Sequence, residues 1–157
     1  MRILIGLITH AAAAAIGFAA GIYVLPILLA PETPDADALR AAAADAAFSG
    51  TFARDLAGSD FLHWGEGTVS VGAARIVHEG ALAPGPDYKL YLTPEFVEDE
   101  AGFEAIRDGA LRVGDVETFD GFVVDLPDGA DPAAYTTVVV WCESFGEFIT
   151  AARYRAP

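Results

Sequence analysis

The sequence is poor in the residues that build disulfides and thioether ligands. It contains one cysteine, Cys142, and its only methionine is Met1. A single cysteine excludes an intrachain disulfide, and neither a Cys-x-x-Cys nor a Cys-x-x-Cys-His motif is present. A lone thiol is unusual in an oxidising compartment. Thiol chemistry in this chain therefore rests on one sulfur atom.

Basic residues are also scarce, with nine Lys and Arg against 23 Asp and Glu. Residues 32–157 hold all 23 acidic residues and eight of the nine basic ones, which gives this part a net charge of −15. Nucleic acid requires Lys and Arg to neutralise its phosphates, and anionic lipid attracts the same residues. The composition argues against both partners, and a solvated acidic surface is the simpler interpretation.

Sequence motifs of the common hydrolases and phosphate-binding proteins are absent. There is no Gly-x-Ser-x-Gly, no His-Glu-x-x-His and no phosphate loop. The acidic residues between positions 95 and 104 lack the Asp-x-Asp-x-Asp-Gly spacing of a calcium loop, and such runs are usually solvated. A hydrolase therefore has no nucleophile–base pair to support it.

A long apolar run fills the N-terminus. No residue from Ile3 to Ala30 is charged, and about 20 apolar residues suffice to cross a bilayer. The run exceeds the ~7–15-residue core of a cleavable signal peptide, which stays the alternative. Arg2 precedes the run and an acidic flank follows it, so the positive-inside rule places the N-terminus in the cytoplasm. We predict a signal anchor over residues 1–30 that contacts membrane through residues 3–30. The chain would cross a bacterial inner membrane once, with its C-terminal domain periplasmic or extracellular.

The remainder divides into a linker and a β-domain. Residues 31–47 read as an acidic linker and a short Ala-rich helix, capped by Asp35 or Asp37 and serving as a stalk. Residues 48–157 are predicted to form an extracytoplasmic all-β domain. Apolar alternation and turn residues predict about eight short strands, at 48–52, 67–72, 75–78, 87–92, 110–113, 118–126, 138–141 and 145–154. Turns are expected at 79–80, 84–86 and 127–132, with a turn or two of helix within 95–109 and a helical turn capped by Asp131. The pattern is typical of an antiparallel β-sandwich or barrel.

The unbroken apolar run Val138–Trp141 predicts a strand buried on both faces, and it ends on Cys142. Strand geometry places Cys142 on the face of Val138 and Val140, and Trp141 on the opposite face. A strand end can present an open site on a rigid element, so Cys142 is a candidate redox residue. No Lys or His adjoins it in sequence to lower its pKa, so a partner must come from the fold. A buried structural thiol is the alternative.

Other candidate site residues are histidines and aromatics. His63 and His78 could join Cys142 in holding a cofactor, and the simpler interpretation makes His63 a loop residue and His78 an exposed strand residue. Haem held by Cys142 or a histidine is a possible cofactor. Copper would call for a further His after Cys142 and a Met ligand, and zinc lacks a fourth ligand, so no metal site is predicted. The candidate binding aromatics are Trp64, Tyr91 and Trp141, with core packing as the alternative.

Three segments resemble a known family. They are Pro86–Leu92, Val124–Asp131 and Tyr135–Phe145, the last with Trp-Cys at the end of a valine run. Together they are similar to the DM-thirteen domain, the proposed electron-transfer domain of animal Skeletor-type surface proteins and of bacterial secreted proteins. The resemblance covers residues 48–154. It implies an all-β domain whose hallmark cysteine, here Cys142, acts in redox chemistry as a bare thiol or by holding a prosthetic group such as haem.

These observations predict a membrane-anchored extracytoplasmic redox or electron-transfer module that uses Cys142. Anchoring would hold the domain near a membrane redox partner and raise its effective concentration. The alternative is a non-catalytic β-sandwich that binds a ligand or a protein and in which Cys142 is structural.

Overall fold

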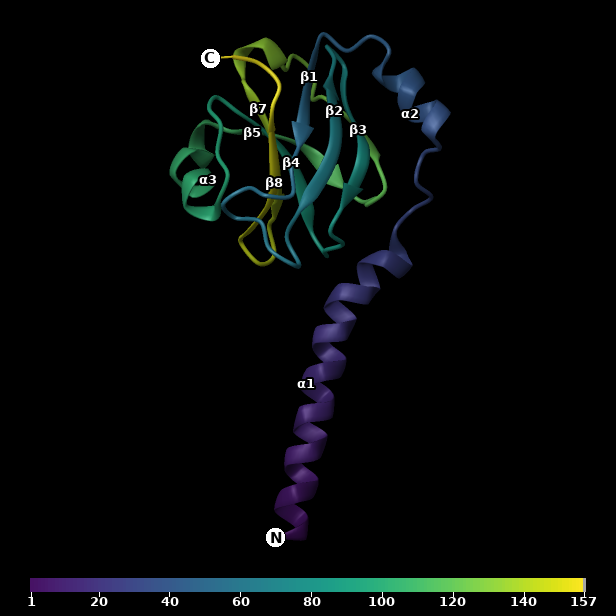
Figure 1. The fold of residues 1–157 in the computed structure, drawn as a ribbon, viewed down its shortest axis with the longest axis vertical. Coiled ribbons are helices and arrows are strands. Elements are labelled where there is room, and N and C mark those ends of the chain that lie inside the picture. The colour runs from purple at the N-terminus through teal and green to yellow at the C-terminus, as the bar shows by residue number, and fades with distance from the viewer. Residues whose placement is uncertain (157) are drawn as a thin grey trace.

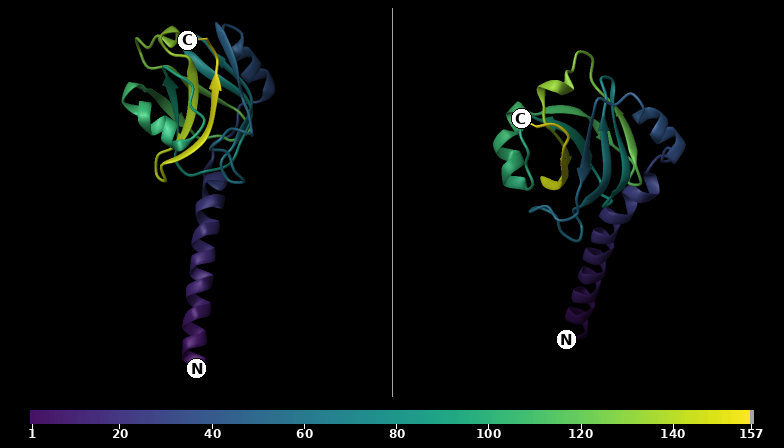
Figure 2. Two further views of the ribbon diagram at one scale, coloured as in Figure 1. Left: turned by 60° about the vertical axis from the view of Figure 1, so that its left-hand side comes forward. Right: turned by 45° about the horizontal axis from the view of Figure 1, so that its top comes forward.

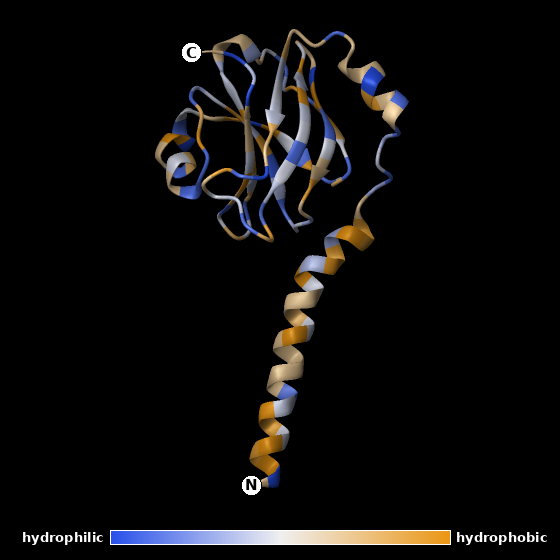
Figure 3. Cartoon of the chain, viewed as in Figure 1, coloured by the Kyte–Doolittle hydropathy of each residue, from blue (hydrophilic) through white to orange (hydrophobic). Residues whose placement is uncertain are grey.

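A long N-terminal helix and a β-domain make up the chain, of which the computed structural model describes residues 1–156. Figure 1 shows the helix, α1 (Arg2–Leu29), reaching the β-domain with its C-terminal end. α1 is long and apolar enough to cross a membrane, with a mean hydropathy of 2.2 and no burial in its most apolar window. Figure 3 shows apolar residues along most of α1 and mixed polarity over the domain. The predicted N-terminal apolar helix is thus confirmed.

Eight antiparallel strands form the β-domain, as predicted. They are β1 (Phe48–Phe52), β2 (Gly65–Val71), β3 (Arg75–Leu82), β4 (Tyr88–Thr93), β5 (Leu111–Val116), β6 (Phe122–Asp125), β7 (Thr137–Cys142) and β8 (Glu147–Arg153). Sheet A has the order β1-β2-β3-β6 and sheet B the order β5-β4-β7-β8. β1 lies against β8 and β5 against β6, but no strand pairing joins the sheets within residues 1–156. The domain is therefore a sandwich, and Figure 2 shows its two layers face to face.

β7 is buried on both faces, as its apolar run predicts. Val138, Val140 and Cys142 belong to the core between the sheets, whereas Val139 and Trp141 pack on the outer face of sheet B. The short helix α3 (Glu100–Ile106) contributes a second, smaller core on that outer face. Asp99 caps α3 by accepting a hydrogen bond from the Gly102 amide at 2.7 Å. Two covers, sheet A and α3, account for the absence of polar alternation along β7.

Some strand ends differ from the prediction where glycine was taken to mark a turn. The predicted turn at Glu79–Gly80 is wrong, because β3 continues to Leu82. Gly80 pairs with Gly67 of β2, whose φ is 117°. A side chain on either glycine would collide with the other strand's backbone, so these glycines allow a close approach that continues the ladder. The last strand was predicted to start at residue 145, but β8 starts at Glu147. Residues 145 and 146 belong to a turn, with Gly146 at φ 67°.

The short helices tie the chain to the sandwich. α2 (Ala36–Ala43) is capped as predicted, with the Asp35 carboxylate accepting from the Ala38 amide at 2.8 Å. The expected stalk is wrong, because Leu39 is 5% exposed and lies close to Gly121, which precedes β6. Six residues separate α1 from α2, so the domain is held close to the end of α1. Two 3-10 helices, η1 (Arg107–Gly109) and η2 (Pro132–Ala134), complete the fold, and Asp131 caps η2 as predicted.

Candidate functional site around Cys142

Cys142 is the last residue of β7 and lies directly opposite Tyr88 of β4. Its side chain is 3% exposed at one end of the core between the sheets. Burial raises the pKa of the Cys142 thiol above its ordinary value, and hydrogen bonding to the Phe145 backbone only partly offsets this. The resting thiol is therefore protonated at neutral pH. Its reactive thiolate form requires a base nearby.

A cavity of about 340 Å³ opens beside Cys142. Three segments of the domain contribute to it: the loop 58–64, the loop between β3 and β4, and the β7–β8 turn with the start of β8. The lining residues are Leu62, His63, Pro84, Gly85, Pro86, Tyr88, Cys142, Phe145, Glu147 and Ile149, with Ala19, Ile22 and Tyr23 of α1. The volume is at the lower end of the ~300–1,000 Å³ that small-molecule sites occupy. The sulfur thus borders a mostly apolar cavity whose titratable lining residues include His63, Glu147 and Tyr88.

The loop 58–64 is folded around the carboxylate of Asp60, which orients His63. The Asp60 carboxylate accepts hydrogen bonds from the amides of Leu62 at 2.7 Å and His63 at 2.8 Å. The same oxygen lies 3.1 Å from His63 Nδ1. Burial opposes the charged carboxylate, but these hydrogen bonds together outweigh it and lower the pKa of Asp60. A carboxylate on Nδ1 selects the tautomer that leaves Nε2 as a proton acceptor.

His78 lies elsewhere and is not the exposed strand residue that its position in sequence predicts. Its ring is fully buried between Phe52 and Phe122, with ring centroids 5.1 and 5.0 Å away. Nε2 lies 3.0 Å from the Glu66 carbonyl oxygen, and Nδ1 has no partner among residues 1–156. Burial lowers the pKa of His78, so the ring is neutral. His63 shares a cavity with Cys142, and His78 does not line it.

The three candidate binding aromatics also lie away from the sulfur. Tyr91 and Trp141 pack with Phe103 of α3 on the outer face of sheet B, at centroid distances of 5.2 and 4.6 Å from the Phe103 ring. Trp64 lies under the guanidinium of Arg54, whose carbon is 3.3 Å from the ring centroid. None of the three lines the cavity of Cys142 within the described chain. The strand alternation that separates Trp141 from Cys142 was predicted from the sequence, and it places them on opposite faces.

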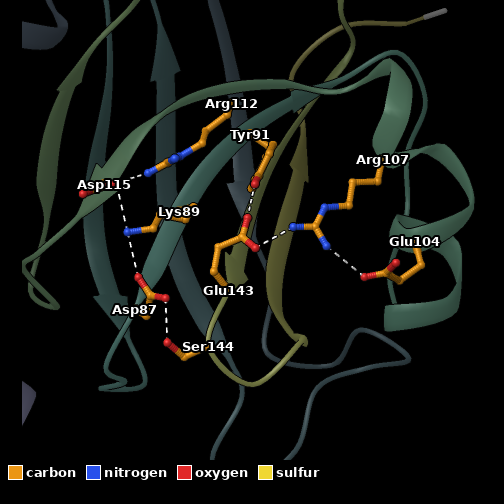
Figure 4. A network of polar contacts seen from close by, with 9 residues as sticks. All are labelled: Asp87, Lys89, Tyr91, Glu104, Arg107, Arg112, Asp115, Glu143 and Ser144. Atoms are coloured by element: carbon orange, nitrogen blue, oxygen red, sulfur yellow. Dashed lines mark hydrogen bonds and ion pairs between the residues drawn. The ribbon is translucent and has the colours of Figure 1, made fainter.

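A polar network on the outer face of sheet B borders the turn after Cys142, and sequence reasoning missed it (Figure 4). Glu143 accepts hydrogen bonds from Tyr91 and from Arg107, the latter at 2.5 Å. Although burial opposes it, these donors lower the pKa of Glu143. Burial and the bond to Glu143 raise the pKa of Tyr91. Glu143 therefore faces away from the cavity as a paired anion and is not the base for Cys142.

A second branch of the network fixes the β7–β8 turn to β4. The Ser144 hydroxyl donates to Asp87 at 2.7 Å, and Lys89 bridges Asp87 and Asp115 at 2.7 and 3.0 Å. The bond from Lys89, and then that from Ser144, lowers the pKa of Asp87. Asp87 and Ser144 both lie in segments that resemble the known family. Their contact could not be predicted from sequence, because it depends on the register of β4 against β7. These contacts hold the wall of the cavity in place.

The sequence matches the family described as Electron transfer DM13 over residues 56–154, which is more than half of the chain. No curated protein and no solved structure matches it. The matched range includes seven of the eight strands, the Asp60–His63 loop and Cys142 at the end of β7. The chain therefore belongs to the DM13 electron-transfer family.

Proposed function

We propose that this protein is a membrane-anchored extracytoplasmic electron-transfer module whose redox group is the thiol of Cys142. The observation that carries the proposal is the position of the sulfur: it ends a rigid, fully buried strand and borders a cavity shared with His63. Membership of an electron-transfer family supports the reaction class. The fold supplies what the sequence around Cys142 lacks, a histidine beside the sulfur's cavity.

The proposed arrangement in the membrane follows the charge of the chain. Residues 1–30 act as a signal anchor, residues 31–47 as linker and helix, and residues 48–157 as the extracytoplasmic domain. Arg2 is the first residue of α1 and an acidic segment follows the helix, which favours a cytoplasmic N-terminus in a bacterial inner membrane. The domain then lies in the periplasm or outside the cell. A redox partner in the same membrane would meet it at a raised effective concentration.

The chemistry requires a proton to leave Cys142 before the sulfur can react. The thiolate is the nucleophile, and burial holds the thiol protonated. His63 borders the same cavity and is oriented by Asp60, so we assign it the role of proton acceptor. With one cysteine in the chain, the proposed redox step is thiol–disulfide exchange with a partner. The Cys142 thiolate attacks a disulfide of the partner, the partner's S–S bond breaks, a mixed disulfide forms, and the second partner sulfur leaves as a thiolate. A sulfenic acid would form only with a peroxide as the two-electron oxidant.

Of the predicted haem ligands Cys142, His63 and His78, two lie at the same cavity. Cys142 and His63 line the cavity, whereas His78 is enclosed between two phenylalanines. Such a group would supply one-electron chemistry through its iron when bound. The small size of the cavity and the protonated state of the sulfur favour the bare thiol.

The test measures thiol alkylation and absorbance on the full chain in phosphatidylcholine nanodiscs. We expect one reactive thiol per folded chain, an alkylation rate that rises with pH, and no Soret band. His63→Gln and Asp60→Asn should slow alkylation at neutral pH, with less effect at high pH where the thiolate forms unaided. Glu147→Gln, on the same cavity, is the matched control. A sulfur that reacts only at the rate of global unfolding would refute the redox role.

One observation favours a second candidate function, a non-catalytic binding module. Cys142 is 3% exposed and its pKa is raised, as for a structural cysteine. The cavity would then hold a small apolar ligand, with the sulfur as part of its wall. Under this alternative, Cys142→Ala keeps the biological activity of the protein in cells, whereas under the redox proposal it abolishes that activity.

A further inference from the structure

Three exposed apolar side chains gather at one end of the β-domain. Among residues 30–156, the exposed large hydrophobic side chains are Phe61 at 91%, Phe145 at 54% and Leu62 at 45%. We call these three residues the apolar rim. Leu62 and Phe145 line the Cys142 cavity together with residues of α1, and Figures 1 and 2 both show the β7–β8 turn at the end of the domain that faces α1. Exposed apolar residues that gather beside a cavity mark an interaction surface.

The loops that carry the apolar rim are held in fixed conformations. Asp60 accepts hydrogen bonds from the amides of the two residues that follow Phe61. The β7–β8 turn is closed by a hydrogen bond from the Gly146 amide to the Cys142 carbonyl at 2.9 Å, and Ser144 ties it to Asp87. The side chains of the rim are therefore presented to their surroundings by rigid turns.

The length of α1 points to what surrounds the rim. α1 has 28 residues, which corresponds to roughly 42 Å of helix. A bilayer core of about 30 Å is crossed by about 20 residues, so the last turns of α1 exceed the span. These turns are apolar from Tyr23 to Leu29, contain Pro26, and end six residues before α2. Tyr23, at the start of these turns, is of a residue type that is enriched in the interfacial layer.

We propose that the apolar rim docks the β-domain onto the lipid bilayer, inserting into the interfacial layer beside the end of α1. The inference rests on the membrane anchoring of the proposed function and adds a second, direct contact with lipid. Tyr23 of α1 lines the same cavity as Leu62 and Phe145, so the anchor and the rim form one continuous apolar surface. The mouth of the Cys142 cavity then opens at the membrane surface.

The charges near the rim decide which lipid it fits. Asp60 turns its carboxylate toward its own loop and His63, and Asp87 is paired with Lys89. Glu147 borders the cavity, and the domain as a whole is strongly acidic. Repulsion from anionic headgroups would oppose docking, so the surface fits zwitterionic or neutral lipid.

The experiment places an environment-sensitive fluorophore on single cysteines in the full chain carrying Cys142→Ser. Phe61→Cys and Phe145→Cys report on the rim. Asp128→Cys, on the exposed turn before η2 at the other end of the sandwich, is the matched control. Ala14→Cys, in the middle of α1, reports on anchoring separately. Each variant is placed, one copy per disc, in phosphatidylcholine nanodiscs with or without lipid spin-labelled near the top of the acyl chain.

We expect blue-shifted emission and loss of most of the fluorescence at positions 61 and 145 in the spin-labelled discs, and neither effect at position 128. Added phosphatidylglycerol should weaken the quenching at the rim. Quenching at position 14 without quenching at 61 and 145 would overturn the docking proposal while leaving the anchor intact. Absence of quenching at position 14 would instead refute the membrane anchoring of α1. A blue shift at positions 61 and 145 that occurs only with two copies per disc, and without quenching by spin-labelled lipid, would contradict the proposal. It would show that the rim contacts a second copy of the chain.

Discussion

The two ends of the sandwich are built differently, although β7 runs from one to the other. We call the end with the Cys142 cavity the cavity end and the end with η2 the distal end. At the distal end, buried hydroxyls bond backbone oxygens: Tyr154 to Pro132 at 2.7 Å and Thr136 to Pro94 at 2.9 Å. At the cavity end, two loops expose apolar side chains around a cavity. The difference indicates that stability is concentrated at one end and access to the sulfur at the other.

The largest expected effect compares two residues on the same face of β7. Val138→Ala, at the distal end, should lower the free energy of unfolding by roughly 2–3 kcal/mol, because Val138 is fully buried in the core. Cys142→Ala, at the cavity end, should cost roughly 1 kcal/mol, because the removed atom already borders a cavity. Urea unfolding of the full chain measures both. Equal costs would mean that the cavity end is packed as tightly as the distal end.

The next prediction exchanges a hydroxyl at each end. Tyr154→Phe leaves the Pro132 carbonyl without its buried partner and should cost about 1–3 kcal/mol. Tyr88→Phe, on the cavity wall opposite Cys142, keeps the buried ring and removes only the hydroxyl, so it should cost less than about 1 kcal/mol. Burial, and after it the charge of Cys142, raises the pKa of Tyr88, so the alkylation rate of Cys142 is measured beside stability. Thermal unfolding and thiol alkylation are measured on both variants. If Tyr88→Phe proved more destabilising than Tyr154→Phe, stability would not be concentrated at the distal end.

The third prediction concerns His78 and pH. Burial lowers the pKa of His78 in the folded state, so the unfolded chain binds the proton more readily. Stability from this group is complete above the unfolded pKa of about 6.5. It falls as the pH drops below that value, with a slope of at most about 1.4 kcal/mol per pH unit.

Urea midpoints between pH 7.5 and 5 measure this slope. His78→Gln should remove most of it, whatever its effect on stability at pH 7.5. The carboxylates with lowered pKa, such as Asp87 and Glu143, lose their contribution in the more acidic range. A slope that survives in His78→Gln would show that another group titrates there.

The contrast between the two histidines also shows how far sequence could predict the site. The alternation along Val138–Cys142 was readable, because strand geometry alone separates Cys142 from Trp141. The burial of His78 was not, since it depends on Phe52 and Phe122 from two other strands. The sharing of a cavity by His63 and Cys142 joins residues 79 positions apart in the sequence. Local patterns predict faces and turns, whereas such contacts follow from how the two sheets and their loops pack.

The smallest expected effect tests whether the cavity end is held by its surface network. Ser144→Ala removes the hydrogen bond to Asp87, an exposed contact whose loss should cost less than about 1 kcal/mol. The global stability should therefore hardly change, but the turn after Cys142 loses a tie to β4. Amide exchange of residues 143–146 should speed up, and Cys142 should be alkylated faster, because local opening needs less free energy than global unfolding. Arg155→Ala, which removes a comparable exposed contact to Ala133 at the distal end, should leave both rates unchanged. If both variants accelerate alkylation equally, the sulfur is reached by opening of the whole sandwich and the two ends do not differ in access.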